Sequence, residues 1–102
     1  MEGSALTEAI YYMLLALHEP LHGYGIMQKV ETMSAGRVRL AAGTLYGALS
    51  AMVGKGWIHP LPGEASSRRK EYEITQTGKA IAANELTRLR ELVANGEMTI
   101  GG

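Results

Sequence analysis

GTLYGALSAMVGKGWI, residues 43–58, has the periodicity of an amphipathic helix followed by a turn. Wound at about 100° per residue, the helix places its larger apolar side chains on one side. These are Leu45, Ala48, Leu49 and Met52. The opposite side holds only small residues, Gly43, Gly47, Ser50 and Gly54. Glycine inside a helix costs roughly 0.5–1 kcal/mol relative to alanine, so this bare side indicates that something large approaches it closely. A DNA groove is such an object.

Composition places the chain among ordinary globular proteins. Its 102 residues fit one domain near the lower end of the size that buries an adequate core, so dimerisation would add stability. A hydrophobic share of 46% with 20% charged residues argues against disorder. The lack of cysteine excludes disulfide scaffolds and thiolate metal sites, and the apolar run at 9–17 is too short to cross a bilayer. We expect a soluble, cytoplasmic protein without membrane contact, cofactor or metal.

The charges are unevenly distributed although the formal net charge is zero. Residues 28–70 carry seven lysines and arginines against two glutamates, an excess of five, and the two ends together carry the compensating negative charge. Local potential governs attraction to phosphate more than total charge does, so the centre of the chain is a candidate basic face. A solvated surface of mixed charge is the alternative interpretation.

The first half of the chain predicts three helices. Residues 5–18 form the first, capped by Thr7 and carrying apolar side chains on two sides. Residues 23–33 form a short second helix, whose inward side chains are Ile26, Val30 and Met33. The third helix ends at Gly56, which suits the left-handed conformation.

The second half predicts a hairpin and a last helix. Strands at 57–61 and 70–75 flank a polar tip rich in turn residues. The last helix runs from about 76 to 94, is capped by Thr75 and ends at Asn95 and Gly96. We expect a frayed tail at 97–102.

This order of elements predicts a mainly α fold with a small β-hairpin. It is a winged helix-turn-helix at 1–75 with an added C-terminal dimerisation helix at 76–96, both in one compact domain. The first and last helices carry apolar side chains that one subunit leaves uncovered, which indicates that a second copy covers them. The residues expected at this interface, or lining an effector pocket within it, are Tyr11, Tyr12, Leu15, Ala82, Leu86, Leu89 and Val93. Simple core packing is the alternative for the tyrosines and the methionines.

His18, Glu19 and His22 spell HExxH, the zinc-protease signature. That chemistry needs both histidines one turn apart on one helical face. Pro20 stands between them and breaks a helix, so we interpret the phrase as the turn between the first two helices, with His18 capping the first.

Four phrases in order make the chain resemble the PadR family of bacterial transcriptional regulators: HGYGI at 22–26, GTLYGAL at 43–49, KGWI at 55–58 and RRKEYEITQTGKA at 68–80. The resemblance covers roughly residues 5–94, although many members have proline where this chain has Gly47. The short C-terminal part is similar to the branch that dimerises through a single final helix together with the first. The resemblance implies a non-enzymatic regulator, and we expect a repressor that binds a near-palindromic operator in double-stranded DNA as a homodimer. A small aromatic or amphipathic effector is expected to release it.

The resemblance also implies which residues contact DNA. The third helix enters the major groove, and the residues nearest the DNA are Gly43, Thr44, Tyr46, Gly47 and Ser50. No arginine lies on this side, so we expect specificity to depend on DNA shape and on fit to thymine methyl groups. The candidates for phosphate contacts are Tyr24, Lys29, Arg37, Arg39, Lys55, Ser66, Ser67, Arg68, Arg69 and Lys70. The alternatives are that Tyr46 packs against its own domain and that the basic wing tip is only solvated.

Two functions of other classes remain open. A winged-helix module that binds another protein is favoured by the neutral net charge, and a small-molecule-binding protein would use the interface cavity without DNA. Neither would show the steep salt dependence of DNA binding.

Overall fold

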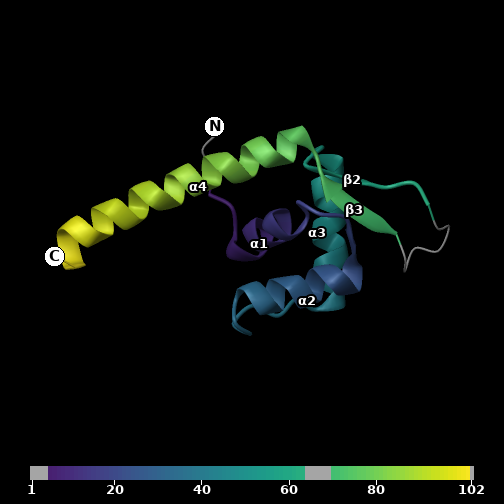
Figure 1. The fold of residues 1–102 in the computed structure, drawn as a ribbon, viewed down its shortest axis with the longest axis horizontal. Coiled ribbons are helices and arrows are strands. Elements are labelled where there is room, and N and C mark those ends of the chain that lie inside the picture. The colour runs from purple at the N-terminus through teal and green to yellow at the C-terminus, as the bar shows by residue number, and fades with distance from the viewer. Residues whose placement is uncertain (1–4, 64–69, 102) are drawn as a thin grey trace.

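The structure, a computed structural model, describes residues 5–63 and 70–101. Figure 1 shows α1, α2 and α3 gathered beside a small sheet, with α4 projecting from them as an arm that carries the C-terminus. The predicted mainly helical, winged helix-turn-helix fold is confirmed. The elements are α1 (Glu8–Ala16), β1 (Leu21–His22), α2 (Gly23–Met33), α3 (Ala42–Gly54), β2 (Ile58–Pro60), β3 (Glu71–Ile74), α4 (Gln76–Gly96) and the π-helix η2 (Glu97–Gly101).

The apolar core lies between the three clustered helices and the sheet. From α3 it receives Leu45, Leu49 and Met52, none more than 1% exposed, so the predicted inner side of this helix is confirmed. On α2 the prediction is right for Ile26 and Val30 but wrong for Met33, which is 37% exposed. Met33 is the last residue of α2, and the buried residues of this helix all lie before it. The complete core is Met13, Leu14, Ala16, Leu17, Ile26, Val30, Leu40, Leu45, Leu49, Met52, Ile58, Ile74 and Ala82.

The turn between α1 and α2 contains both histidines of the HExxH phrase. Nδ1 of His18 lies 3.0 Å from the carbonyl oxygen of Leu14, where it caps the end of α1 as predicted. His22 is the N-cap of α2, and its Nδ1 accepts a hydrogen bond from the backbone N–H of Gly25 at 3.3 Å. The two histidines therefore serve different helices, and the phrase does not lie on one helical face. Helix α1 itself begins at Glu8, later than predicted, because Thr7 is the N-cap and its side chain accepts from the N–H of Ile10.

The sheet has three strands, one more than the predicted hairpin, in the antiparallel order β1-β3-β2. Leu21 of β1 pairs with Tyr72 of β3, and Ile58 of β2 pairs with Ile74. Strand β1 has only two residues, too few for the alternation by which strands are found in a sequence. Strands β2 and β3 are each a residue shorter at both ends than predicted. Because β1 joins the start of α2 to the wing, the helix-turn-helix and the wing form one body.

Helix α4 has the bounds predicted for the last helix, Gln76–Gly96. The hydroxyl of Thr75 accepts from the N–H of Gly78 at 3.0 Å and lies 2.6 Å from the carbonyl oxygen of Gly56. Gly56 has the expected left-handed conformation after α3, with φ of 78°. The helix ends at Gly96, as predicted. The frayed tail predicted after it is wrong as far as residue 101, because Glu97–Gly101 continue helically as η2. Within the described residues no helix is long and apolar enough to cross a membrane.

Candidate nucleic-acid interface

The outer side of α3 is exposed and bare. A Cβ atom built on Gly43, Gly47 or Gly54 would meet no other atom within 4 Å. Thr44 and Ser50 on the same surface are exposed, and the helix continues unbroken through Gly47. This surface, which we call the α3 face, consists of Gly43, Thr44, Tyr46, Gly47, Ser50 and Gly54. Larger side chains would fit at these three glycines, so packing within the subunit does not explain why glycine stands there.

Tyr46 is the one large side chain on the α3 face. It is 46% exposed, and its ring leans against the start of α2. A Cβ atom on Gly23 would lie only 2.5 Å from the Tyr46 hydroxyl oxygen. The pKa of Tyr72 on β3 is raised, first by burial and then by the nearby Tyr46 hydroxyl. Tyr46 therefore packs against its own domain and at the same time presents part of its ring to solvent.

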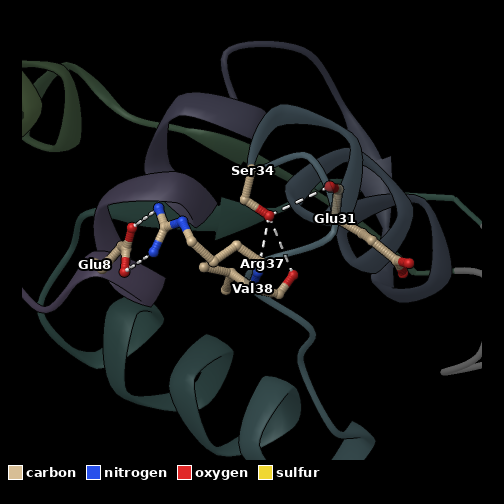
Figure 2. A network of polar contacts seen from close by, with 5 residues as sticks. All are labelled: Glu8, Glu31, Ser34, Arg37 and Val38. Atoms are coloured by element: carbon tan, nitrogen blue, oxygen red, sulfur yellow. Dashed lines mark hydrogen bonds and ion pairs between the residues drawn. The ribbon is translucent and has the colours of Figure 1, made fainter.

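Three of the cations predicted to contact phosphate are paired with carboxylates. Lys29 pairs with Glu19, and Arg37 pairs with Glu8, to which it donates two hydrogen bonds in Figure 2. The Arg37 hydrogen bonds hold the pKa of the Glu8 carboxyl below its ordinary value, against a smaller opposing effect of desolvation. The third pair joins Arg39 to Glu31 at 3.4 Å.

These pairs correct the estimate of a basic centre. Glu8 and Glu19 lie outside residues 28–70, and the fold brings them to cations inside that range, so counting charges along the chain overstates the local excess. All the paired side chains are at least 40% exposed, and exposed ion pairs of this kind contribute little stability. Breaking one of these pairs therefore costs the fold little free energy.

The loop between α2 and α3 is organised by one buried hydroxyl. Ser34 is 7% exposed; its Oγ accepts from the N–H of Val38 at 2.9 Å and donates to the carbonyl oxygen of Glu31 at 3.2 Å (Figure 2). Two left-handed residues, Ala35 and Gly36, reverse the chain beside it. This turn sets how α3 follows α2, and the sequence pattern did not single it out.

The other predicted phosphate contacts are spread around the α3 face. Tyr24 is 64% exposed, and its hydroxyl accepts from the side-chain amide of Gln28 at 3.2 Å. The Nζ atom of Lys55 lies 4.8 Å from the centre of the Trp57 ring, and Lys70 is exposed just before β3. Ser66, Ser67, Arg68 and Arg69 lie outside the described residues.

The model of the transcriptional regulator PadR-like family matches residues 13–84. The chain belongs to this family. Regulators of the PadR family bind DNA and are not enzymes. The predicted family resemblance is thereby confirmed.

Solved structures support this assignment of the PadR-like chain. A PadR family transcription regulator from Clostridium difficile R20291 is 26% identical, with a TM-score of 0.73, over 88% of this chain and 95% of that one. A PadR-like regulator from Bacillus cereus strain ATCC 14579 is 19% identical with a TM-score of 0.72, over 92% and 91% of the two chains, and shares the fold.

A curated relative of the PadR-like chain comes from Streptomyces fradiae. It is an uncharacterized 37.1 kDa protein in transposon TN4556, 35% identical over 80 residues, which is 78% of this chain. The PadR-like chain spans 22% of that relative's length.

Away from the α3 face, α1 and α4 of the PadR-like chain line a cavity of about 520 Å³ that is open to solvent on one side. Tyr11, Tyr12, Leu15 and Leu89 from the predicted interface line it, together with Leu6, Thr7, Glu8, Glu85 and Arg88. Leu86, Leu89 and Val93 line a shallower hollow of about 310 Å³ farther along α4. Ala82 does not belong with them, because it is 6% exposed and packs in the core of its own subunit.

Glu85, at the wall of this cavity, is a buried acid that the sequence analysis missed. It is 5% exposed; Nε of Arg88 donates to it at 3.0 Å and the backbone N–H of Leu6 donates at 3.4 Å. The Arg88 hydrogen bond is the main reason that the pKa of Glu85 lies below its ordinary value, and burial opposes it. Glu85 and Arg88 have the i,i+3 spacing of a helix pair, but only the fold places Leu6 beside them.

Proposed function

We propose that this chain binds double-stranded DNA at specific sequences and regulates transcription in the cytoplasm. The observation that carries the proposal is the α3 face. Its three glycines have open space above them, and they lie on the second helix of the helix-turn-helix, whose inner side chains Leu45, Leu49 and Met52 are buried. A helix with such an outer side can approach the base edges of a major groove closely. Membership of the PadR-like family supports the same function.

Sequence readout in this proposal is sparse. The α3 face offers hydroxyl groups from Thr44, Tyr46 and Ser50 but no guanidinium group for the bidentate contact with guanine. Specificity therefore comes from close fit to thymine methyl groups and from the shape of the DNA. The surrounding cations and the wing contact phosphates and set the register of the protein on the duplex.

The proposal includes a homodimer held by α1 and α4. Leu86, Leu92 and Val93 on α4 are 39%, 52% and 57% exposed, which is unusual for large apolar side chains of a single small subunit. A two-fold arrangement presents two α3 helices to successive major grooves, about 34 Å apart, on a near-palindromic operator. Such a dimer bound over a promoter represses transcription.

The cavity between α1 and α4 gives the proposed regulator a place for an effector. Its tyrosines and leucines suit a planar or amphipathic molecule, and charged groups stand at its wall. Some conformations of the dimer hold the two α3 helices at a spacing that does not fit the operator. An effector that binds these conformations better increases their share of the protein and so lowers the affinity for the operator.

Selection of bound fragments from a genomic library tests the proposed function. We expect recovered fragments to share a near-palindrome, and binding to random duplex DNA to weaken steeply with salt. Failure to enrich any fragment, together with salt-insensitive binding, would contradict the proposal. That result would favour a protein-binding module, the alternative supported by the neutral net charge and the paired cations.

A matched pair of variants tests the role of the α3 face in DNA binding. Gly47→Ala adds a methyl group where nothing lies within 4 Å, so it leaves the fold intact and obstructs only an approaching DNA groove. Thr87→Ala is a similarly small change at an exposed position on another side of α4 and is the control. We expect operator affinity to fall about tenfold or more for the first variant and to stay unchanged for the second.

A further inference from the structure

Gly23 and Tyr46 meet at the junction of α2 and α3. Gly23 is buried at the first position of α2, and Tyr46 projects from α3 across it. A Cβ atom at residue 23 would lie 2.5 Å from the Tyr46 hydroxyl oxygen, 3.0 Å from ring atom Cζ and 3.3 Å from Cδ2 of Leu45. The space that the tyrosine hydroxyl occupies exists only because residue 23 has no side chain.

The backbone at Gly23 is the rigid side of this contact. The preceding strand β1 pairs with β3, through Leu21 with Tyr72 and His22 with Glu71. The side chain of His22 also caps α2, through the N–H of Gly25. Because strand pairing and helix capping both hold this segment, a new side chain at residue 23 would displace the far end of Tyr46 and not the backbone.

A second observation places the Tyr46 hydroxyl at the same junction. The raised pKa of Tyr72 has the Tyr46 hydroxyl as its second cause after burial. The hydroxyl group of a tyrosine can both donate and accept a hydrogen bond, as contacts with base edges require. The end of the Tyr46 ring lies against Gly23 at the start of α2, and 46% of the residue is exposed.

We propose that Gly23 is a positioning residue for DNA recognition: it orders Tyr46 on the α3 face without itself touching DNA. This inference rests on the proposed function, since it concerns how the same face reads its operator. A side chain already held in its bound orientation loses less conformational entropy when it meets DNA. Gly23 thereby affects sequence-specific contacts and leaves phosphate contacts unchanged.

The test is a double-mutant cycle of Gly23→Ala and Tyr46→Phe, with Gly25→Ala as the control. A Cβ atom on Gly25 would meet Leu21 and His22 but not Tyr46, although it lies on the same helical turn. Affinities are measured for the operator recovered with the wild-type protein and for a random duplex of equal length. We expect Gly23→Ala to weaken operator binding about tenfold and to leave random-duplex binding unchanged.

The cycle separates positioning from a general structural effect. If Gly23 acts through the hydroxyl, the double variant binds the operator no more weakly than Tyr46→Phe alone. Additive losses, or an equal loss on random duplex, overturn the inference. Should Gly23→Ala alone be unfolded, the double variant is compared with Tyr46→Phe, because Phe removes the atom nearest the new methyl group.

Nuclear Overhauser contacts in the free protein give an independent measurement. Contacts between the Gly23 α-protons and the Tyr46 ring are expected in the wild type and in Gly25→Ala, and their absence from the wild type overturns the inference. A wild-type protein that shows these contacts but binds no DNA overturns the proposed function and this inference together. If the wild-type protein and the Gly23→Ala variant bind the operator equally well, this inference is overturned and the proposed function is not.

Discussion

At the scale of single residues, glycines in this chain have different physical roles. Gly47 faces open space, Gly23 makes room for a side chain, and Gly78 makes room for backbone. A Cβ atom on Gly78 would collide with the carbonyl oxygen of Trp57 and lie 2.7 Å from Cγ1 of Ile74. The same carbonyl accepts from the N–H of Thr75 at 3.0 Å, so this is where α4 joins the wing.

Gly78→Ala is expected to destabilise the protein by about 2–3 kcal/mol, because the obstructing atom belongs to the backbone and cannot rotate away. Gly96→Ala on the same helix has no neighbour within 4 Å and is expected to raise stability by up to about 1 kcal/mol. Urea denaturation of both variants measures the difference. Equal free energies of unfolding for the two variants would show that the Trp57 carbonyl group does not exclude a side chain at position 78.

At the scale of elements, few contacts hold α4 to the rest of the subunit. Of its 21 residues only Gly78, Ala82 and Glu85 are buried, all in the first half of the helix. Glu85 joins the helix to the segment before α1 through the N–H of Leu6, and Arg88 partners the same carboxylate. The angle of the α4 arm therefore depends on a charged contact as well as on packing.

The Glu85 contact predicts a dependence of stability on pH. The pKa of Glu85 is lowered in the folded state, so its contribution to stability is present above the ordinary value of 4.5 and is lost as pH falls through the lower folded value. Glu85→Gln should reduce stability at neutral pH and make the acid side of the stability curve less steep. Glu91→Gln, on the exposed side of α4, is the control. Denaturation at a series of pH values would contradict the assignment if both variants kept the wild-type curve.

The wing sequence contains two adjacent arginines, Arg68 and Arg69. Replacing Arg68 and Arg69 with alanine should weaken binding to all DNA sequences alike and reduce the slope of log affinity against log salt by about 1–2. Arg37→Ala should change the slope less, because Glu8 already neutralises that guanidinium in the free protein. Filter-binding titrations at several salt concentrations measure both slopes. A larger change for Arg37 would place the phosphate contacts beside α1 and away from the wing.

At the scale of the whole molecule, the subunit is elongated, with extents of 54 × 30 × 20 Å. The length comes from the α4 arm, as Figure 1 shows. The side chains of Leu86, Leu92 and Val93 are exposed along the arm, and Met98 and Ile100 are exposed at its end. Burying these side chains against a second copy would remove apolar surface that one short chain cannot cover by itself.

Val93→Glu is expected to separate the proposed dimer into subunits, because the new carboxylate would be placed in an apolar contact. Operator affinity should fall by more than tenfold, since a single subunit reaches only one half-site. Thr87→Glu adds the same charge to an exposed position on another side of α4 and should change neither property. Sedimentation at micromolar concentration measures the mass. A Val93→Glu protein that sediments like the wild type and still binds the operator tightly would rule out this interface.

Local patterns in the sequence determined the helices, their caps at Thr7 and Thr75, the left-handed Gly56 and the bare side of α3, because each depends on residues within a few positions of one another. Four other features depend on the three-dimensional fold: the third strand, the pairing of Arg37 with Glu8, the burial of Glu85 beside Leu6 and the packing of Tyr46 against Gly23. These features join residues between 23 and 79 positions apart, and no periodicity in a sequence records which distant residues a compact core brings into contact.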